Sequence, residues 1–127
     1  HANYGLVPGG GSSARLPRKI GPTRAKQLIY SGEFLAAEQM QDWGLVNWVV
    51  ENDLLASELE NQIRILSKKS PIGLRRMKQM VNDGLEQPLE QALKTELLLN
   101  AQHANSADRL EGLAAFADKR QPDFKGH

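Results

Sequence analysis

Only two short segments of this 127-residue chain have the composition of β-strands, and this scarcity limits the fold more than any other feature. Residues 4–7 form a short apolar run that Pro8 must end, and residues 45–50 (LVNWVV) are β-branched and aromatic. About 40 residues separate the two segments, and two strands alone do not form a stable sheet. We therefore expect the rest of the sheet to lie in a further part of a longer protein or in partner chains.

The rest of the chain has the pattern of helices. Apolar residues recur at helical spacing in about seven segments. Pro22 and Ser106 are typical of helix starts, whereas Pro17 is expected to break the first helix. Gly44 is expected to end a short helix in a left-handed cap. The predicted fold class is therefore an α-rich α/β protein.

Composition excludes several classes of protein. The chain has 16 basic and 15 acidic residues and a net charge of +1, which excludes the strongly basic surface of a nucleic-acid-binding protein. A content of 40% hydrophobic and 24% charged residues is typical of a globular domain. No apolar run is long enough to span a membrane and no secretory signal pattern is present, so we expect a cytoplasmic protein. Residues 1–32 nevertheless contain five basic residues and no acidic one.

A glycine-rich loop, Gly9-Gly10-Gly11-Ser12-Ser13-Ala14, follows the first apolar run. It fits the loose dinucleotide-binding pattern G-x-G-x-x-A, although Pro8 intrudes and no βαβ unit is expected after it. The simplest interpretation is a tight turn. A third possibility is a loop whose N–H groups, at a helix N-terminus, face a ligand.

Metal sites are not predicted. The chain has no cysteine, so thiolate ligands, disulfides and a cysteine nucleophile are all excluded. Its three histidines are His1, His103 and His127, and no two of them have the spacing of metal ligands. His1 and His127 are the end residues, where a residue left by cloning is an alternative.

Cationic and aromatic side chains alternate near the C-terminus, at Phe116, Lys119, Arg120, Phe124 and Lys125. Ammonium and guanidinium groups bind phosphate, and an aromatic face stacks on a nucleobase. The alternative is a helix end whose basic residues only complement the helix dipole. Composition alone favours this second interpretation.

The order of the motifs resembles the second half of a crotonase-superfamily protein, the enoyl-CoA hydratase/isomerase family. The resemblance rests on Gly5-Leu6-Val7-Pro8-Gly9-Gly10-Gly11, Arg15-Leu16-Pro17, Ser31-Gly32-Glu33, Gly44-Leu45-Val46-Asn47, Ser106, Asp108, Glu111-Gly112, Ala115-Phe116, Lys119-Arg120, Pro122 and Phe124. Family members are about twice as long, so the resemblance implies a missing N-terminal half.

The resemblance also implies a fold and an assembly. Residues 1–51 would end a spiral of ββα units, and residues 52–127 would be a helical region that builds a homotrimer or hexamer. The whole protein would hydrate or isomerise an acyl-CoA thioester through a stabilised enolate, with coenzyme A as part of the substrate and no separate cofactor. The chain alone would be inactive, because both oxyanion donors belong to the missing half.

The resemblance assigns roles to individual residues. His1 stands at the position of the family's second catalytic acid, where an imidazole would serve as base. Pro8, Gly9 and Gly10 would line the substrate pocket near the reacting carbons, while Phe116 and Lys119 would contact the adenine and a phosphate of CoA. This match reverses the preference for a purely structural C-terminal cluster. A dinucleotide-binding domain and a non-catalytic helical oligomerisation module are the alternatives.

Overall fold

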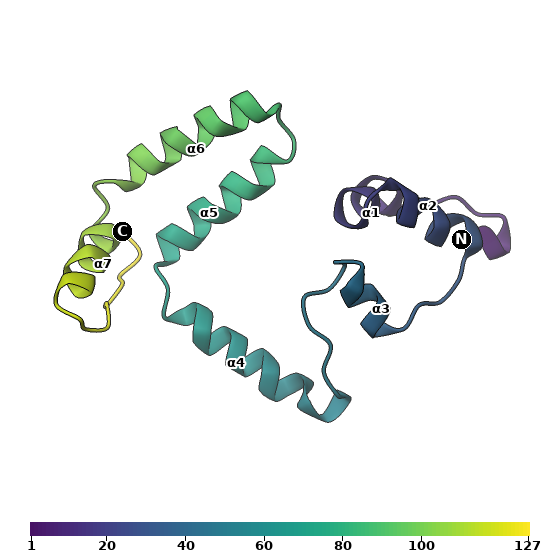
Figure 1. The fold of residues 1–127 in the computed structure, drawn as a ribbon, viewed down its shortest axis with the longest axis horizontal. Coiled ribbons are helices and arrows are strands. Elements are labelled where there is room, and N and C mark those ends of the chain that lie inside the picture. The colour runs from purple at the N-terminus through teal and green to yellow at the C-terminus, as the bar shows by residue number, and fades with distance from the viewer. The chain divides into compact units, whose positions relative to one another are not determined.

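A computed structural model describes all 127 residues, His1–His127. The chain divides into two units, His1–Leu55 and Ala56–His127. Both consist of helices and connecting loops, as Figure 1 shows, and no residue is in a strand.

The first unit is built around two packed helices. Its elements are η1 (Ala2–Tyr4), α1 (Ser12–Ile20), α2 (Pro22–Ser31), α3 (Ala37–Asp42) and η2 (Asn52–Leu54). Helix α1 packs on α2 and buries Ile20 and Ala25. The predicted break at Pro17 is wrong, because α1 continues through it to Ile20. The proline removes only one backbone donor, and its carbonyl still accepts a hydrogen bond from the Gly21 N–H at 3.0 Å.

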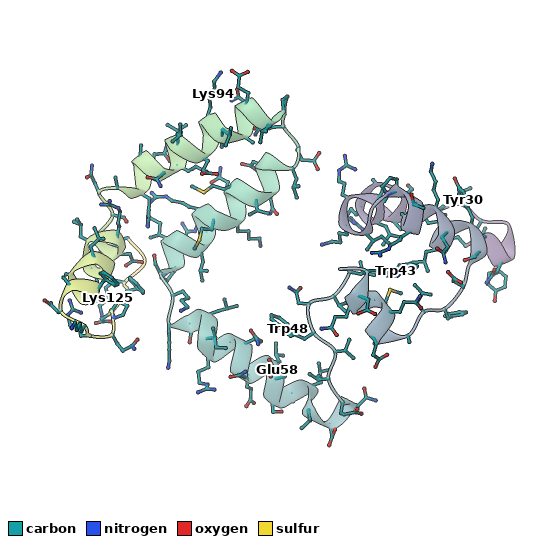
Figure 2. The ribbon with its side chains drawn as sticks, viewed as in Figure 1. Tyr30, Trp43, Trp48, Glu58, Lys94 and Lys125 are labelled. Atoms are coloured by element: carbon teal, nitrogen blue, oxygen red, sulfur yellow. The ribbon has the colours of Figure 1, made fainter.

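The two predicted strands are not confirmed. Tyr4 belongs to η1, and Gly5 follows in a left-handed turn with a φ of 64°. Residues 45–50 lie in a loop, where Trp48 is 60% exposed (Figure 2). A strand forms only where its N–H and C=O groups pair with a neighbouring strand, and the chain supplies no such neighbour. Strand-forming composition is therefore present here without a sheet.

The second unit contains four helices: α4 (Leu55–Ser67), whose first residue belongs to the first unit, α5 (Pro71–Gly84), α6 (Leu89–His103) and α7 (Ala107–Ala117). Helices α5 and α6 form an antiparallel hairpin (Figure 1), in which Leu99 is buried. The Cβ of Ala92 lies 3.6 Å from where a Cβ on Gly84 would stand. This is an ordinary van der Waals distance, so Gly84 and Ala92 face each other at the hairpin's closed end without requiring glycine there.

Serine side chains cap α5 and α7. The Ser70 hydroxyl accepts a hydrogen bond from the Gly73 N–H at 2.9 Å, and the Ser106 hydroxyl accepts one from the Arg109 N–H at 3.2 Å. The predicted cap at Ser106 is confirmed. Each hydroxyl satisfies an N–H that the first helical turn otherwise leaves without a partner.

The only buried charged residue, Asp108, joins α5, α7 and the C-terminal tail. Its carboxylate accepts hydrogen bonds from the Ser70 hydroxyl at 2.6 Å and from the N–H groups of Lys125 and Gly126 at 2.8 and 2.9 Å. Burial acts to raise the pKa of Asp108, but these three hydrogen bonds outweigh it, so the pKa is lowered from 3.8. The anion therefore anchors the tail to both helices.

Most large apolar side chains remain exposed. On α4 the apolar positions at helical spacing, Leu55, Leu59, Ile63 and Leu66, are all more than half exposed. The chain has an accessible surface of 9912 Å², whereas even two separate compact domains of the same total mass would expose about 8,100 Å². Amphipathic helices of this kind are stable when another element covers their apolar face. The surface is that of a part of a larger core.

Candidate functional site

The structure places His1 and Pro8 in one small pocket of the first unit. Its volume is about 210 Å³, and it is lined by His1, Pro8, Ser12, Leu16, Leu28, Ile29 and Gly32. Leu16 of α1 and Leu28 and Ile29 of α2 supply apolar lining, while His1 and Ser12 supply polar groups. Its mixture of apolar surface and few polar groups resembles the lining of a small-molecule site, but its volume is below the roughly 300–1,000 Å³ of such sites.

Hydrogen bonds at η1 fix the backbone of His1. Its carbonyl oxygen accepts hydrogen bonds from the N–H groups of Tyr4 at 3.0 Å and Leu6 at 3.1 Å. The Asn3 side-chain amide donates to the Gly32 carbonyl at 3.1 Å and so ties η1 to the end of α2. These contacts fix the backbone of His1 beside the pocket that His1 and Pro8 both line.

The glycine-rich loop lies beside this pocket. Gly9 and Gly10 are exposed and do not line the pocket itself. Helix α1 begins after Gly11, which has a φ of 87°, and no side chain caps it. No strand precedes the loop, so the strand–loop–helix arrangement that a dinucleotide site requires is absent. The dinucleotide alternative therefore gains no support from the fold.

Arg15 braces the loop, a role that the sequence did not suggest. Its guanidinium donates a hydrogen bond to the Gly10 carbonyl and lies about 3.0 Å from where a Cβ on Gly11 would stand. The sequence does contain a pattern that indicates this contact, because Arg15 follows Gly11 by four residues, the spacing of one helical turn. The side chain therefore folds back over the turn that opens its own helix.

Phe116 and Lys119 lie together at the end of α7. Phe116 is in the last turn and is 86% exposed, and Lys119 is also exposed. The Lys119 N–H donates to the Phe116 carbonyl at 3.3 Å. An exposed aromatic residue and an exposed lysine thus stand three residues apart at one helix end of the second unit.

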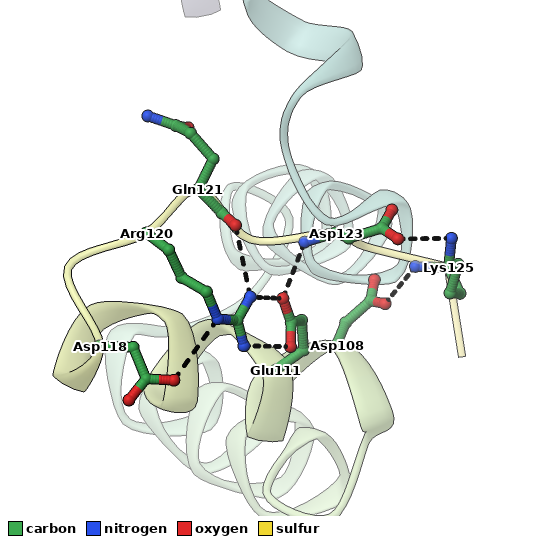
Figure 3. A network of polar contacts seen from close by, with 7 residues as sticks. All are labelled: Asp108, Glu111, Asp118, Arg120, Gln121, Asp123 and Lys125. Atoms are coloured by element: carbon green, nitrogen blue, oxygen red, sulfur yellow. Dashed lines mark hydrogen bonds and ion pairs between the residues drawn. The ribbon is translucent and has the colours of Figure 1, made fainter.

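A network of charges, shown in Figure 3, surrounds this helix end. The Arg120 guanidinium binds both carboxylate oxygens of Glu111, with N–O distances of 2.6 and 2.9 Å. The Asp123 N–H donates to the same carboxylate at 2.8 Å. These two hydrogen bonds, Arg120 first, lower the pKa of Glu111 to about 2, and the pKa of Arg120 is raised mainly by Glu111. The sequence motifs already included Glu111 and Arg120, but their pairing was not predicted, because nine residues separate the partners and no helical spacing links them.

No group of three or more histidine, cysteine, aspartate or glutamate residues is arranged to hold a metal ion. None of the helices has both the length and the apolarity needed to cross a bilayer.

The fold of the chain matches about half the length of solved structures from one class of enzyme. A crystal structure of enoyl-CoA hydratase from Bacillus anthracis superposes with a TM-score of 0.95 at 36% identity, covering 98% of this chain and 48% of that one. A second, of an enoyl-CoA hydratase from Geobacillus kaustophilus, has a TM-score of 0.94 at 32% identity. These neighbours define the chain as part of a crotonase-like fold.

Sequence comparison identifies the family. The model of the enoyl-CoA hydratase/isomerase family matches residues 1–127, so this chain belongs to that family. It is 39% identical over 125 residues to the 2,3-dehydroadipyl-CoA hydratase of Escherichia coli and 37% identical over 126 residues to the bovine mitochondrial enoyl-CoA hydratase domain-containing protein 2. Both matches cover 96% of this chain, but only 48% of the E. coli protein and 43% of the bovine protein. The chain spans about half the length of the curated relatives it matches.

Proposed function

We propose that this chain is the C-terminal part of an enzyme that hydrates or isomerises acyl-CoA thioesters, and that it is inactive without the remaining half. The observation that carries this proposal is the family match over the whole chain, combined with coverage of only about half of each relative. The exposed apolar helix faces support it, because they leave a surface for a further part of the core to cover.

In this proposal the first unit ends the substrate-binding core. The acyl thioester lies against the pocket that His1 and Pro8 line, next to the exposed backbone of Gly9 and Gly10. His1 moves a proton at the α carbon or activates the water that adds to the β carbon, since an imidazole exchanges protons near neutral pH. The missing half supplies the N–H groups that stabilise the enolate oxygen.

The second unit binds the other end of the substrate and assembles the protein. Phe116 stacks on the adenine of CoA, and the Lys119 ammonium binds a phosphate. The helices of residues 52–127 form a homotrimer or hexamer, in which these two residues reach the CoA of a neighbouring subunit. Coenzyme A enters as part of the substrate, and the reaction uses no resident cofactor.

The decisive experiment compares the chain alone with a completed enzyme. We expect no hydration of crotonyl-CoA above background by the isolated chain, and hydration or isomerisation when it is fused to the N-terminal half of the E. coli 2,3-dehydroadipyl-CoA hydratase. In that fusion His1→Glu should raise hydration, because it restores a carboxylate at the position of the family's second acid. Turnover by the chain alone would refute the fragment interpretation, and an inactive but folded fusion would refute the catalytic proposal.

A non-catalytic oligomerisation module is the second candidate, and the apolar stripe of α4 is the observation that favours it. It predicts that the chain alone forms a trimer in light scattering. It also predicts that the fusion binds no CoA in calorimetry.

A further inference from the structure

The end of α7 has an unusual residue in a common backbone motif. The Arg120 N–H donates to the Ala115 carbonyl at 3.0 Å and the Lys119 N–H to the Phe116 carbonyl at 3.3 Å. This pair of hydrogen bonds defines a Schellman cap, in which the residue at the position of Lys119 is left-handed and is usually glycine. Lys119 has a φ of 53° and is the only residue other than glycine with a positive φ.

The same chain contains the ordinary form of this cap at the end of α3. There the Leu45 N–H donates to the Met40 carbonyl at 2.9 Å and the Gly44 N–H to the Gln41 carbonyl at 2.8 Å. The left-handed residue is Gly44, with a φ of 78°. Because a left-handed backbone is unfavourable for any residue with a Cβ, glycine is the stable choice at both positions. Lysine at position 119 therefore points to a use for its side chain.

The Glu111–Arg120 pair holds the residue that follows Lys119. Arg120 is fixed by two hydrogen bonds to Glu111, and Glu111 is fixed in turn by the Asp123 N–H (Figure 3). On the other side of Lys119, the cap is anchored by Ala115, which is 1% exposed. The left-handed backbone of Lys119 thus lies between two fixed points, although its own side chain is exposed.

We propose that Glu111 and Arg120 are positioning residues that keep Lys119 left-handed, so that its ammonium and the Phe116 ring form a preformed surface for the nucleotide end of the CoA substrate. This inference rests on the proposed function. The physical gain is that the turn is ordered before the substrate binds, so binding does not have to order it. The Glu111–Arg120 ion pair offsets the backbone strain at Lys119, a strain that glycine at this position would avoid.

The test is steady-state kinetics with crotonyl-CoA in the full-length protein that contains the chain, together with thermal unfolding. Lys119→Ala and Lys119→Gly should each raise KM about tenfold by removing a charged phosphate contact. Lys119→Gly should also raise Tm by about 2–4 °C, since it relieves the left-handed strain, whereas Lys119→Ala should not. Gly44→Ala, where a Cβ meets no atom within 4 Å, should lower Tm by a similar amount and so calibrates the strain.

The positioning role is tested at Glu111 and Arg120. Arg120→Lys keeps the charge but loses the two-point contact, and Glu111→Gln removes the ion pair; each should raise KM several-fold with little change in kcat. Adding either change to Lys119→Ala should raise KM no further, because no ammonium remains to be positioned. Lys94→Ala, on the exposed face of α6, controls for loss of one positive charge and should change neither constant.

The outcomes separate this inference from the proposed function. Independent effects on KM in the double variants, or an unchanged KM in both Arg120→Lys and Glu111→Gln, would overturn the positioning role and leave the CoA contact intact. An unchanged KM in Lys119→Ala would overturn the CoA contact itself.

Discussion

We expect Ser70→Ala to destabilise the packing of α5, α7 and the C-terminal tail considerably more than Ser106→Ala destabilises α7. The two serines are matched, because each caps a helix by accepting one backbone hydrogen bond. They differ in the acceptor of their hydroxyl proton: Ser70 donates to the buried Asp108 carboxylate, whereas Ser106 donates to the His103 carbonyl at 2.9 Å.

The magnitude follows from these contacts. Loss of a serine cap destabilises a helix by about 1 kcal/mol, and we expect this value for Ser106→Ala. Ser70→Ala removes a similar cap and also one of the three donors to Asp108, which is only 2% exposed and cannot recruit water freely. The free-energy loss should therefore be at least twice that of Ser106→Ala.

Amide hydrogen exchange measured by NMR in the full-length protein that contains the chain reports this loss locally. Protection of the Lys125 and Gly126 amides, which donate to Asp108, should fall about 30-fold in Ser70→Ala, whereas protection within α7 should fall about fivefold in Ser106→Ala. Ser70→Thr keeps a hydroxyl and should restore most of the protection. The difference in lost protection between Ser70→Ala and Ser106→Ala should also become smaller at acidic pH. Because the pKa of Asp108 is lowered from 3.8 in the folded chain, its contribution is complete above that value and is lost as the carboxylate protonates below it.

Equal losses of protection in the two serine variants would refute this reasoning. The reasoning would also be refuted if the larger loss of protection in Ser70→Ala stayed unchanged once Asp108 is protonated, since the effect would then not depend on the buried anion.

Two further predictions concern single residues. Glu111 should titrate with a pKa of about 2 when followed by the NMR shift of its carboxyl carbon, and Arg120→Ala should return this pKa toward 4.5. Because the pKa of Glu111 is lowered in the folded chain, its contribution to stability is complete above about pH 4.5 and disappears as the pH falls toward 2. A pKa near 4.5 in the unchanged chain would show that the pair with Arg120 does not form. Gly32→Ala should destabilise the first unit more than Gly44→Ala, because a Cβ at Gly32 would clash with the Asn3 side-chain amide in addition to the left-handed strain. Adding Asn3→Ala should remove this excess in thermal unfolding, and its persistence would contradict the clash.

The sequence allowed the family and most of the helices to be predicted, because both depend on residues that are close together in the chain. Gly44 was expected as a left-handed cap and has a φ of 78°, and Ser106 was expected to cap a helix and does. The two strands could not be judged in this way, since a strand needs hydrogen-bonding partners that the chain does not supply. Pro17 misled for the opposite reason, because packing of α1 on α2 tolerates a local break signal.

By itself the sequence determined that this chain belongs to the second half of an enoyl-CoA hydratase/isomerase-family protein, since glycine turns, caps and the C-terminal signature are local patterns. Only the tertiary structure decided what holds the candidate site residues. It brought Asp108 under the tail and Glu111 to Arg120. These contacts join residues that are far apart in the sequence, so they form only when the tail folds back on α7.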